Sequence, residues 1–518
     1  MWHELVRNAL SNVGGTLVGL VVGFVTMPLV VHHLGPTEFG LWVLATSLVG
    51  YLSVLDLGLS PTLVNAAAAA LAHDEPSARA RLSETASTIF TTYAALGALG
   101  GTALVIVGTL AGALFQVPAE HLATFRAVLF VVGLQTALNL PMSVWNGLLS
   151  GLQAFHVTNA IGVVLTLVRG ALTVTLVLAG EGVVTIVSAS FAATLGAWAV
   201  AWWCVHRRIP GLRVSFGGFR RARLGDIGRF SLAMVVWTVA GASLHQLDRV
   251  LIGAMLPVAA LTTYEVGARL SMYSRSVLFS WLAVVMPATS ALVTRGERRR
   301  LRALFLRSTR YVLATYGGVA VALVGLGGPF VRLWMGEGFE TSYTVMCLLV
   351  AGNLVVSQNV VAHVMLPGMG ELGVFTRFMG AYAVVAAVCA VGGIVAGGLV
   401  GLAAGVATAM LVMEIAFLVL IVRTRFDVSF RALLARCHAP VLKALLPVGS
   451  WIAAVRALVP IASWPALAAT AIVAGLVFLG AVWTWALTPA ERRAVRGRFA
   501  ARTGMRIAMD VRSRREAA

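Results

Sequence analysis

Arginines stand inside long apolar stretches of the sequence at positions 169, 249, 269 and 275. A charged side chain that faced lipid would cost several kcal/mol, so each should face the interior of a helix bundle or a partner. Arg249 and Arg275 have no obvious partner nearby in the sequence, while a neighbouring helix could satisfy Arg169. A planar guanidinium donates two parallel hydrogen bonds and suits phosphate oxygens better than an ammonium does. We therefore predict that Arg249, Arg269, Arg275 and Arg169 bind an anionic substrate group.

Acidic residues and a histidine accompany two of these arginines around a predicted helical hairpin. Asp248 lies about ten residues before the turn near 258–259 and Arg269 about ten after it, so both are roughly 15 Å from the turn and can pair. Glu265 and Arg269 are four residues apart on one helix face, and so are His245 and Arg249. One interpretation is that Asp248, Glu265 and Arg269 only neutralise one another and fix the hairpin.

Two isolated carboxylates indicate a different chemistry, the binding of a coupling ion. Asp56 lies about 16 residues into its apolar stretch, roughly 24 Å from the outer surface. Gly58 and Pro61 follow it, so the helix can bend there and leave the carboxylate to cap backbone groups. Glu414 lies in the inner half of another apolar stretch. The predicted set for gating, or for binding a coupling proton or sodium ion, is Asp56, Asp248, Glu265, Glu414 and His245; no other cofactor and no metal site is expected.

The elements that hold these residues should be membrane helices. Hydrophobic residues make up 59% of the 518 positions, charged residues only 11%, and the mean hydropathy is +0.90. Soluble domains average about 25% charged residues, so an integral membrane protein is predicted. The net charge of +19 would favour nucleic-acid binding in a soluble protein. Here the arginines lie between apolar stretches and are interpreted as orientation signals, so no nucleic-acid partner is expected.

Apolar stretches long enough to cross a bilayer predict an all-α polytopic membrane protein with about 14 transmembrane helices. A β-barrel is not expected, because alternating ten-residue patterns are absent. The predicted spans cover residues 10–34, 40–65, 84–115, 125–148, 157–178, 183–205, 229–256, 262–293, 311–335, 342–366, 375–396, 399–422, 444–460 and 465–487.

Basic residues gather on one side of this arrangement. Arginines crowd the connections after the sixth, eighth and twelfth spans and the tail after residue 487, whereas the turns at 35–39, 116–123 and 180–182 contain acids and almost no bases. The positive-inside rule then places both termini in the cytoplasm. Short connections leave no room for an aqueous domain, which argues against an enzyme, including a membrane glycosyltransferase or ligase.

The start of the chain has a counterpart near its middle, because residues 8–59 resemble residues 228–285. This repeat predicts two six-helix lobes related by a pseudo-two-fold axis along the membrane normal, an arrangement suited to alternating access. The predicted domains are an N-lobe at 1–206, a basic cytoplasmic linker at 207–228, a C-lobe at 229–423, a helix pair at 424–487 and a basic cytoplasmic tail at 488–518.

Three segments carry a family resemblance: HHLGPTEFGLW (32–42), GYLSVLDLGLS (50–60) and LHQLDRVLIGAMLPVAALTTYEVGARL (244–270). Together they resemble the bacterial polysaccharide-export flippases of the multidrug/oligosaccharidyl-lipid/polysaccharide exporter superfamily. The resemblance implies a translocase that moves an undecaprenyl-pyrophosphate-linked oligosaccharide to the outer leaflet of the bacterial cytoplasmic (inner) membrane. Implied partners are the lipid-linked oligosaccharide, membrane lipid and other polysaccharide assembly proteins. The alternative is a multidrug or small-molecule cation antiporter of the same superfamily, which usually has twelve helices and relies on carboxylates.

Overall fold

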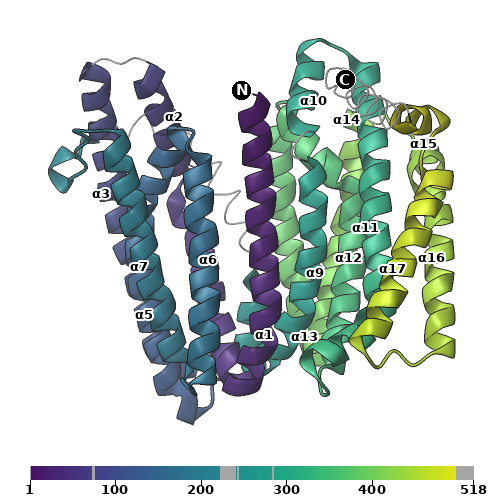
Figure 1. Cartoon of the computed structure of the whole chain (residues 1–518), viewed down its shortest axis with the longest axis horizontal. Coiled ribbons are helices and arrows are strands. Elements are labelled where there is room, and N and C mark those ends of the chain that lie inside the picture. Colours follow the sequence, from purple (N-terminus) through teal and green to yellow (C-terminus); the bar gives the residue numbers. More distant parts are fainter. Residues whose placement is uncertain are drawn as a thin grey trace, which may run out of the picture. The chain divides into compact units, whose positions relative to one another are not determined.

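The computed structural model describes residues 2–72, 76–221, 241, 244, 246–282 and 285–496. Every regular element in these ranges is a helix (Figure 1). Ten helical segments among them are long and apolar enough to cross a membrane, and two of these, Leu17–Asp56 and Leu372–Arg425, each overlap two predicted spans. The prediction of an all-α polytopic membrane protein is confirmed for this part of the chain.

Two compact units emerge from the contacts within the chain. Unit 1 comprises Met1–Arg269 and Gly373–Ala409, and unit 2 comprises Leu270–Leu372 and Met410–Ala518. The predicted division into two lobes, a linker and a helix pair stays a prediction. Its segments 222–240 and 497–518 lie outside the described residues, as does His245.

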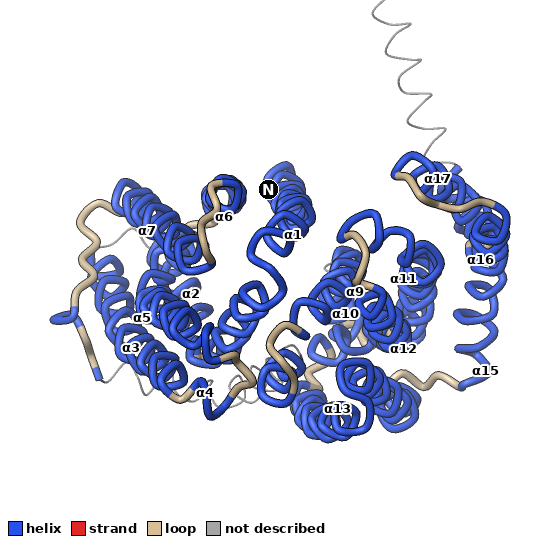
Figure 2. Tube along the Cα trace, turned by 90° about the horizontal axis from the view of Figure 1, so that it is seen from below, coloured by secondary structure: helices blue, strands red, loops and turns tan. Residues whose placement is uncertain are grey.

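Unit 1 is built around long helices that pack against one another. Its elements are α1 (Trp2–Leu52), α2 (Leu59–Ala72), α3 (Pro76–Thr109), α4 (Ala111–Leu114), α5 (Leu122–Gly151), α6 (Phe155–Leu178), α7 (Val183–Arg208), the helical residues 246–255, and parts of α9 (Ala260–Leu282) and α13 (Leu372–Phe417). In Figure 2, α3, α5 and α7 lie side by side with α6 next to α7. Helices α3 and α5 approach so closely that a methyl group on Gly97 would lie 2.5 Å from the carbonyl oxygen of Ala137.

Helix α1 changes direction at Gly35, which adopts φ 76° and ψ 167°. A positive φ of this kind favours glycine, because a Cβ would meet the backbone. A second break follows at Leu57 (φ 49°) and Gly58 (φ 73°), between the short 3₁₀ turn Ser53–Asp56 and the start of α2. The bend predicted beside Asp56 is therefore present, and the predicted span 40–65 is two helices.

Unit 2 has α11 at its centre. Its elements are the rest of α9 and α13, α10 (Val285–Thr294), α11 (Arg298–Met335), α12 (Glu340–Gly368), α14 (Arg423–Arg425), α15 (Phe430–Leu433), α16 (Ala439–Leu458) and α17 (Trp464–Ala481), with π-helical turns at Leu418–Val422, Leu434–His438 and Val482–Ala486. Helix α11 packs against α12, α16 and α17.

The start of α11 departs from the prediction of a basic connection before a span at 311–335. Residues 298–310 are already helical, and Leu301, Phe305 and Leu306 are buried while Arg299 and Arg300 are exposed. An amphipathic helix of this kind buries its apolar face inside the protein, where Phe305 stacks on Phe426, and continues into the span. Arginine is also a good helix former, so the charge run does not interrupt the helix.

Candidate functional site

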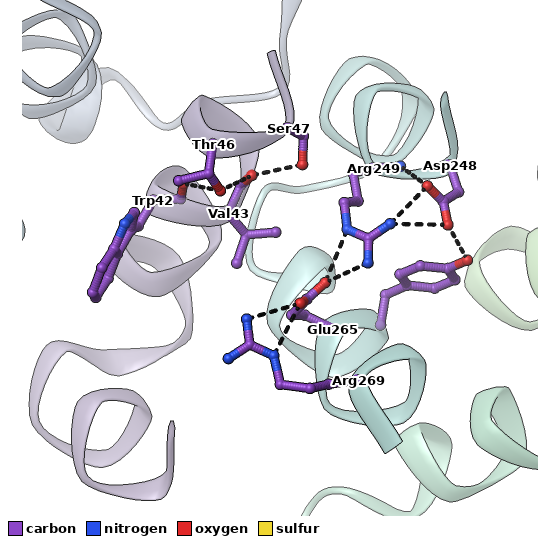
Figure 3. Close-up of polar contacts among 9 residues, drawn as sticks. Trp42, Val43, Thr46, Ser47, Asp248, Arg249, Glu265 and Arg269 are labelled. Carbon is purple, nitrogen blue, oxygen red and sulfur yellow. Dashed lines mark hydrogen bonds and ion pairs between the residues drawn. The ribbon is translucent and has the colours of Figure 1, made fainter. Parts of the chain in front are cut away.

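Four charged side chains of unit 1 meet where the helical residues 246–255 and α9 face each other. We call Asp248, Arg249, Glu265 and Arg269 the charge quartet (Figure 3). The turn at 256–259 brings the two helices back on each other, so residues 16 positions apart in the sequence become neighbours.

Arg249 is the centre of the charge quartet. Its Nη1 lies 3.1 Å from Asp248 Oδ1, and its Nε and Nη2 each lie 2.9 Å from Glu265 Oε2. Arg269 donates from Nη2 and Nε to Glu265 Oε1 at 3.1 and 3.2 Å. Tyr264 donates its hydroxyl to Asp248 Oδ2, and its ring lies 5.9 Å from the Arg249 guanidinium.

These contacts confirm one sequence-based expectation and correct two others. Glu265 and Arg269 pair at i, i+4 as predicted. The interpretation that Arg249 has no obvious partner nearby in the sequence is wrong, because the adjacent Asp248 pairs with it. The hairpin turn adds Glu265 from the opposite helix. The expected pairing of Asp248 with Arg269 is replaced by contacts of Asp248 with Arg249 and Tyr264.

The charge quartet is electrically balanced, since it holds two arginines and two carboxylates. Asp248, Arg249 and Glu265 are largely buried, and Arg269 is the most exposed member, with 28% of its side chain accessible. A buried ion pair of this kind is strongly disrupted when one partner is removed. The quartet is thus well suited to holding the hairpin, with Arg269 the member most accessible to a ligand.

The turns of the two hairpins in unit 1 pack against each other. Thr262 donates its hydroxyl to Pro36 O at 2.6 Å, and a methyl group on Gly40 would lie only 2.3 Å from Val258 O. On the same side of α1, Ser47 is buried beside the charge quartet and donates to Val43 O at 2.7 Å (Figure 3). The two segments related by the predicted repeat are therefore in direct contact.

Arg169 has a different environment from the arginines of the charge quartet. It lies on α6 and donates from Nη2 to Thr194 Oγ1 of α7 at 2.5 Å, while its Nε is buried without a hydrogen-bond partner among the described residues. No carboxylate of the described chain pairs with it. Among the described residues, the partner of this cation at membrane depth is a neutral hydroxyl.

A polar face of α6 leads to Arg169. Thr158, Gly162, Thr166 and Thr173 share this face with it, at intervals of three or four residues. The first three are partly or fully exposed and Thr173 is buried. The exposed apolar side chains of α6, such as Leu167 and Leu178, lie on another side of the helix. Along the polar face of α6, Arg169 therefore follows three accessible positions, Thr158, Gly162 and Thr166.

Glu414 lies at the centre of a buried polar cluster in unit 2. Asn359 Nδ2 donates to Glu414 O at 2.7 Å and to Oε2 at 2.9 Å, and His363 Nε2 lies 3.5 Å from Oε2. Glu414 Oε1 and Asn359 Oδ1 are buried acceptors without a hydrogen-bond partner among the described residues. Arg275, half-buried on α9, is close enough to act electrostatically on Glu414 and His363.

Asn359 and His363 were not identified from the sequence. They are four residues apart on α12, so a pair of polar side chains on one face of a predicted span was the available signal. Neutral polar residues also occur in ordinary helix–helix contacts, as between Asn353 and Ser271 at 2.9 Å. Two polar residues four positions apart in a predicted span therefore do not by themselves distinguish this cluster from an ordinary helix–helix contact.

Asp56 is held by hydroxyl groups. Its Oδ1 accepts hydrogen bonds from Tyr93 and, at 3.0 Å, from Ser60. Tyr93 is fully buried in the core formed by α2, α3 and α5. The Asp56 carboxylate lies at the break between α1 and α2. Its described hydrogen bonds come from side-chain hydroxyls, not from backbone N–H groups, and the one from Tyr93 attaches the break to α3.

Comparison with known proteins identifies the family of this chain. Residues 30–344 match the model of the family described as Polysaccharide biosynthesis protein. The chain belongs to this family. This membership confirms the resemblance to polysaccharide-export proteins that the three sequence segments indicated.

This chain is also similar to another protein in sequence and to solved structures in fold. The uncharacterized membrane protein EpsK of Bacillus subtilis (strain 168) is 23% identical over 371 residues, which cover 68% of this chain and 69% of EpsK. The structure resembles the lipid II flippase MurJ in an inward closed conformation, with a TM-score of 0.70, 10% identity and coverage of 91% of this chain and 97% of MurJ. It also resembles an inward-facing multidrug resistance MATE transporter of the MOP superfamily, with a TM-score of 0.66, 19% identity and coverage of 80% and 94%.

At these identities the solved structures share the fold with this chain. The protein is a multi-pass membrane protein of polysaccharide biosynthesis with the fold of transporters and flippases, and a fold of about 14 membrane helices agrees with these matches. The likeness to the MATE transporter does not favour an antiporter, because it lies in the fold alone.

Proposed function

We propose that the protein moves an undecaprenyl-pyrophosphate-linked oligosaccharide from the cytoplasmic to the outer leaflet of a bacterial cytoplasmic membrane by alternating access. Membership of the Polysaccharide biosynthesis protein family and a fold shared with flippases support this proposal. Both termini lie in the cytoplasm, as the distribution of arginines along the sequence favours. The protein supplies binding and passage and makes or breaks no covalent bond.

The observation that carries the proposal is the environment of Arg169. An arginine at membrane depth without a carboxylate partner is costly, and binding an anion would offset that cost. The pyrophosphate of the substrate has oxygens that match the guanidinium fork. The polar face of α6, with Thr158, Gly162 and Thr166, provides a path along which such a group reaches Arg169.

The packed turns of the two hairpins act as the outer gate. Thr262 and Pro36 are joined by a hydrogen bond, and Gly40 lies against the backbone of Val258. Glycine at position 40 permits this close approach, since a larger side chain would collide with a carbonyl oxygen. Substrate enters from the cytoplasmic side while these turns are packed and leaves after they separate. Arg269, the most exposed member of the charge quartet, assists in holding the anion.

The Glu414 cluster couples translocation to a proton. A fully buried carboxylate with an unpaired oxygen is costly when ionised and is relieved by binding a proton. His363 and Arg275 are the charged or titratable groups that act on it, and Asn359 fixes its orientation. Proton release then requires a state in which water reaches Glu414.

Depletion of the protein followed by lipid extraction tests the main proposal. Lipid-linked oligosaccharide should build up on the cytoplasmic leaflet, where it stays inaccessible to an enzyme added outside intact spheroplasts. A normal distribution between the leaflets after depletion would show that the protein does not move this lipid. Complementation with the wild-type chain is the control, because it should restore accessibility.

A further inference from the structure

In unit 2, α11 packs against both α12 and α16 (Figure 1). A cavity of about 470 Å³ opens among these three helices. This volume is within the range of small-ligand pockets and is too small for a helix of a partner protein. The cavity has no part in the charge clusters described above, and the proposed translocation does not use it.

The walls of the cavity are almost entirely apolar. Helix α11 contributes Val321 and Val324, α12 contributes Val350 and Leu354, and α16 contributes Ile452, with small residues between them. Val324 and Leu354 are exposed, with 42% and 37% of their surface accessible. At the depth of a membrane span, an open apolar cavity faces hydrocarbon, so its natural contents are acyl chains and not water.

Glycine at position 449 is responsible for part of this space. A methyl group there would have only one atom within 4 Å, a Cγ of Val321 at 3.9 Å. A few residues further along α16, Ile452 packs tightly against Gly325 of α11. The two helices are thus in contact at Ile452 and leave a gap at Gly449, which makes the cavity a local feature of the α11–α16 packing.

One cation stands at the rim of this apolar space. Arg456 lies two residues before the end of α16 and donates from Nη1 to Gly325 O at 3.1 Å. No ion pair with a carboxylate of the described chain involves it, in contrast to Arg332 of α11, which lies 2.7 Å from Glu337. Tyr343 on the same rim donates its hydroxyl to Val324 O at 2.6 Å and is close enough to Arg456 to interact with it.

We propose that this cavity is a binding site for an anionic phospholipid, with one acyl chain between α12 and α16 and the phosphate group on Arg456. The chemistry of the two parts matches, because an apolar slot lies directly beside an exposed guanidinium near a helix end. Arginine binds phosphate oxygens with charge-assisted hydrogen bonds that are about twice as strong as neutral ones. Phospholipid is also the most abundant anionic lipid that reaches this side of the helix bundle, so mass action favours it over the undecaprenyl chain of the substrate.

Native mass spectrometry of the full-length protein tests the site directly. The protein is released from vesicles that contain equal amounts of phosphatidylglycerol and phosphatidylcholine, and the lipids that remain bound are counted. Wild type should retain phosphatidylglycerol in preference. Gly449→Leu, which fills the cavity, should abolish one retained lipid, and Arg456→Gln should reduce the preference for phosphatidylglycerol about tenfold, equivalent to ~1.4 kcal/mol.

Two matched variants control for general effects of these substitutions. Gly475→Leu places the same side chain on α17, where a Cβ meets nothing within 4 Å, and Arg332→Gln removes another arginine of unit 2. Both should retain lipid as wild type does. Unchanged retention by Gly449→Leu, an unchanged preference in Arg456→Gln, or displacement of phosphatidylglycerol by an equal amount of undecaprenyl phosphate would overturn the proposal.

Discussion

Arg249 and Arg169 are both arginines at membrane depth in unit 1, but they are compensated in different ways. Arg249 contacts the carboxylates of Asp248 and Glu265, while Arg169 donates to the hydroxyl of Thr194. The cost of placing an arginine in an apolar stretch is similar at both positions. The partner therefore decides whether the arginine holds the protein together or stays available to a ligand.

Carboxylates of unit 2 show the same contrast. Glu491, just beyond the last span, accepts hydrogen bonds at 2.7 Å from Arg310 on both oxygens and lies 2.9 Å from Arg307. Glu414 is contacted by Asn359 and His363 and retains one unpaired oxygen. A carboxylate with both oxygens bound by arginines contributes to stability, whereas one with an unpaired buried oxygen can be relieved by taking up a proton.

Arg249→Met should give the largest effect, since it leaves two buried carboxylates with Arg269 as their remaining cation among the described residues. We expect the free energy of unfolding to fall by about 3–5 kcal/mol and the yield of membrane-inserted protein to fall with it. Thermal unfolding in detergent measures the first quantity and quantitative blotting of membranes the second.

Arg269→Gln is the matched control for the charge quartet. It removes an arginine that is 28% exposed and whose ion pair in the described part of the chain is with Glu265, so its effect on stability should be smaller, about 1–2 kcal/mol. If Arg249→Met were as stable as Arg269→Gln, the distinction between structural and available arginines would not hold.

Arg169→Gln should give the next largest effect, and it should appear in transport and not in stability. Loss of a charge-assisted contact to the substrate anion is worth about 1.5–3 kcal/mol, which corresponds to a decrease of about 10- to 100-fold in translocation. The free energy of unfolding should change by less than about 1 kcal/mol, because no described carboxylate is left without its partner. Reconstituted vesicles with lipid-linked oligosaccharide measure the rate.

Arg169→Lys separates charge from geometry at the same position. It keeps the positive charge and loses the planar fork, so its rate should lie between those of wild type and Arg169→Gln. Wild-type translocation by Arg169→Gln would remove this residue from the binding site and leave the charge quartet as the remaining candidate.

The sequence predicts the helices of this protein well where apolar residues fill a span. The predicted spans 157–178 and 342–366 differ by only a few residues from α6 (Phe155–Leu178) and α12 (Glu340–Gly368). The prediction fails at the start of α11, because hydropathy does not detect an amphipathic helix that continues into a span. Where a helix lies in the membrane is thus easier to predict than where it begins.

The candidate site is less predictable, because its contacts depend on how one helix is rotated against the next. Glu265 and Arg269 were correctly paired, since a helix fixes the geometry of residues four apart. The contact of Arg249 with Glu265 crosses a turn, and spacing along the chain does not determine which faces meet there. The partners of Glu414 were missed for the same reason, as Asn359 and His363 come from another helix.

Glu491→Gln tests the contrast between paired and unpaired carboxylates through a smaller change in stability. Burial alone would raise the pKa of Glu491, but hydrogen bonds from Thr488 and Tyr311, together with Arg310, hold this pKa below its usual value. The group therefore stabilises the folded state at neutral pH. This contribution is lost as the pH falls below about 4.3, the unfolded value, and through the lower folded value.

The expected loss for Glu491→Gln at neutral pH is about 1–2 kcal/mol, because the ion pairs lie at the membrane surface and Arg307 is largely exposed. Below about pH 4.3 wild type and variant should converge in thermal unfolding, since wild type then loses the same contacts. Glu297→Gln, which breaks the exposed pair with Arg300, is the control and should cost less than about 0.5 kcal/mol at any pH. Equal stability of Glu491→Gln and wild type at neutral pH would contradict the assignment.

Glu414→Gln should change stability little, yet it tests the contrast most directly. Glutamine resembles the protonated carboxyl in shape and still accepts the hydrogen bond from Asn359, so the free energy of unfolding should change by less than about 1 kcal/mol. Translocation by wild type in vesicles should respond to an imposed pH gradient, and translocation by Glu414→Gln should not, because the amide neither gains nor loses a proton in this pH range. Glu371→Gln, which breaks the contact with Arg425 at 2.7 Å in the same unit, should respond as wild type does. If Glu414→Gln still followed the pH gradient, the unpaired oxygen of Glu414 would be a feature of packing alone and would not mark a coupling site.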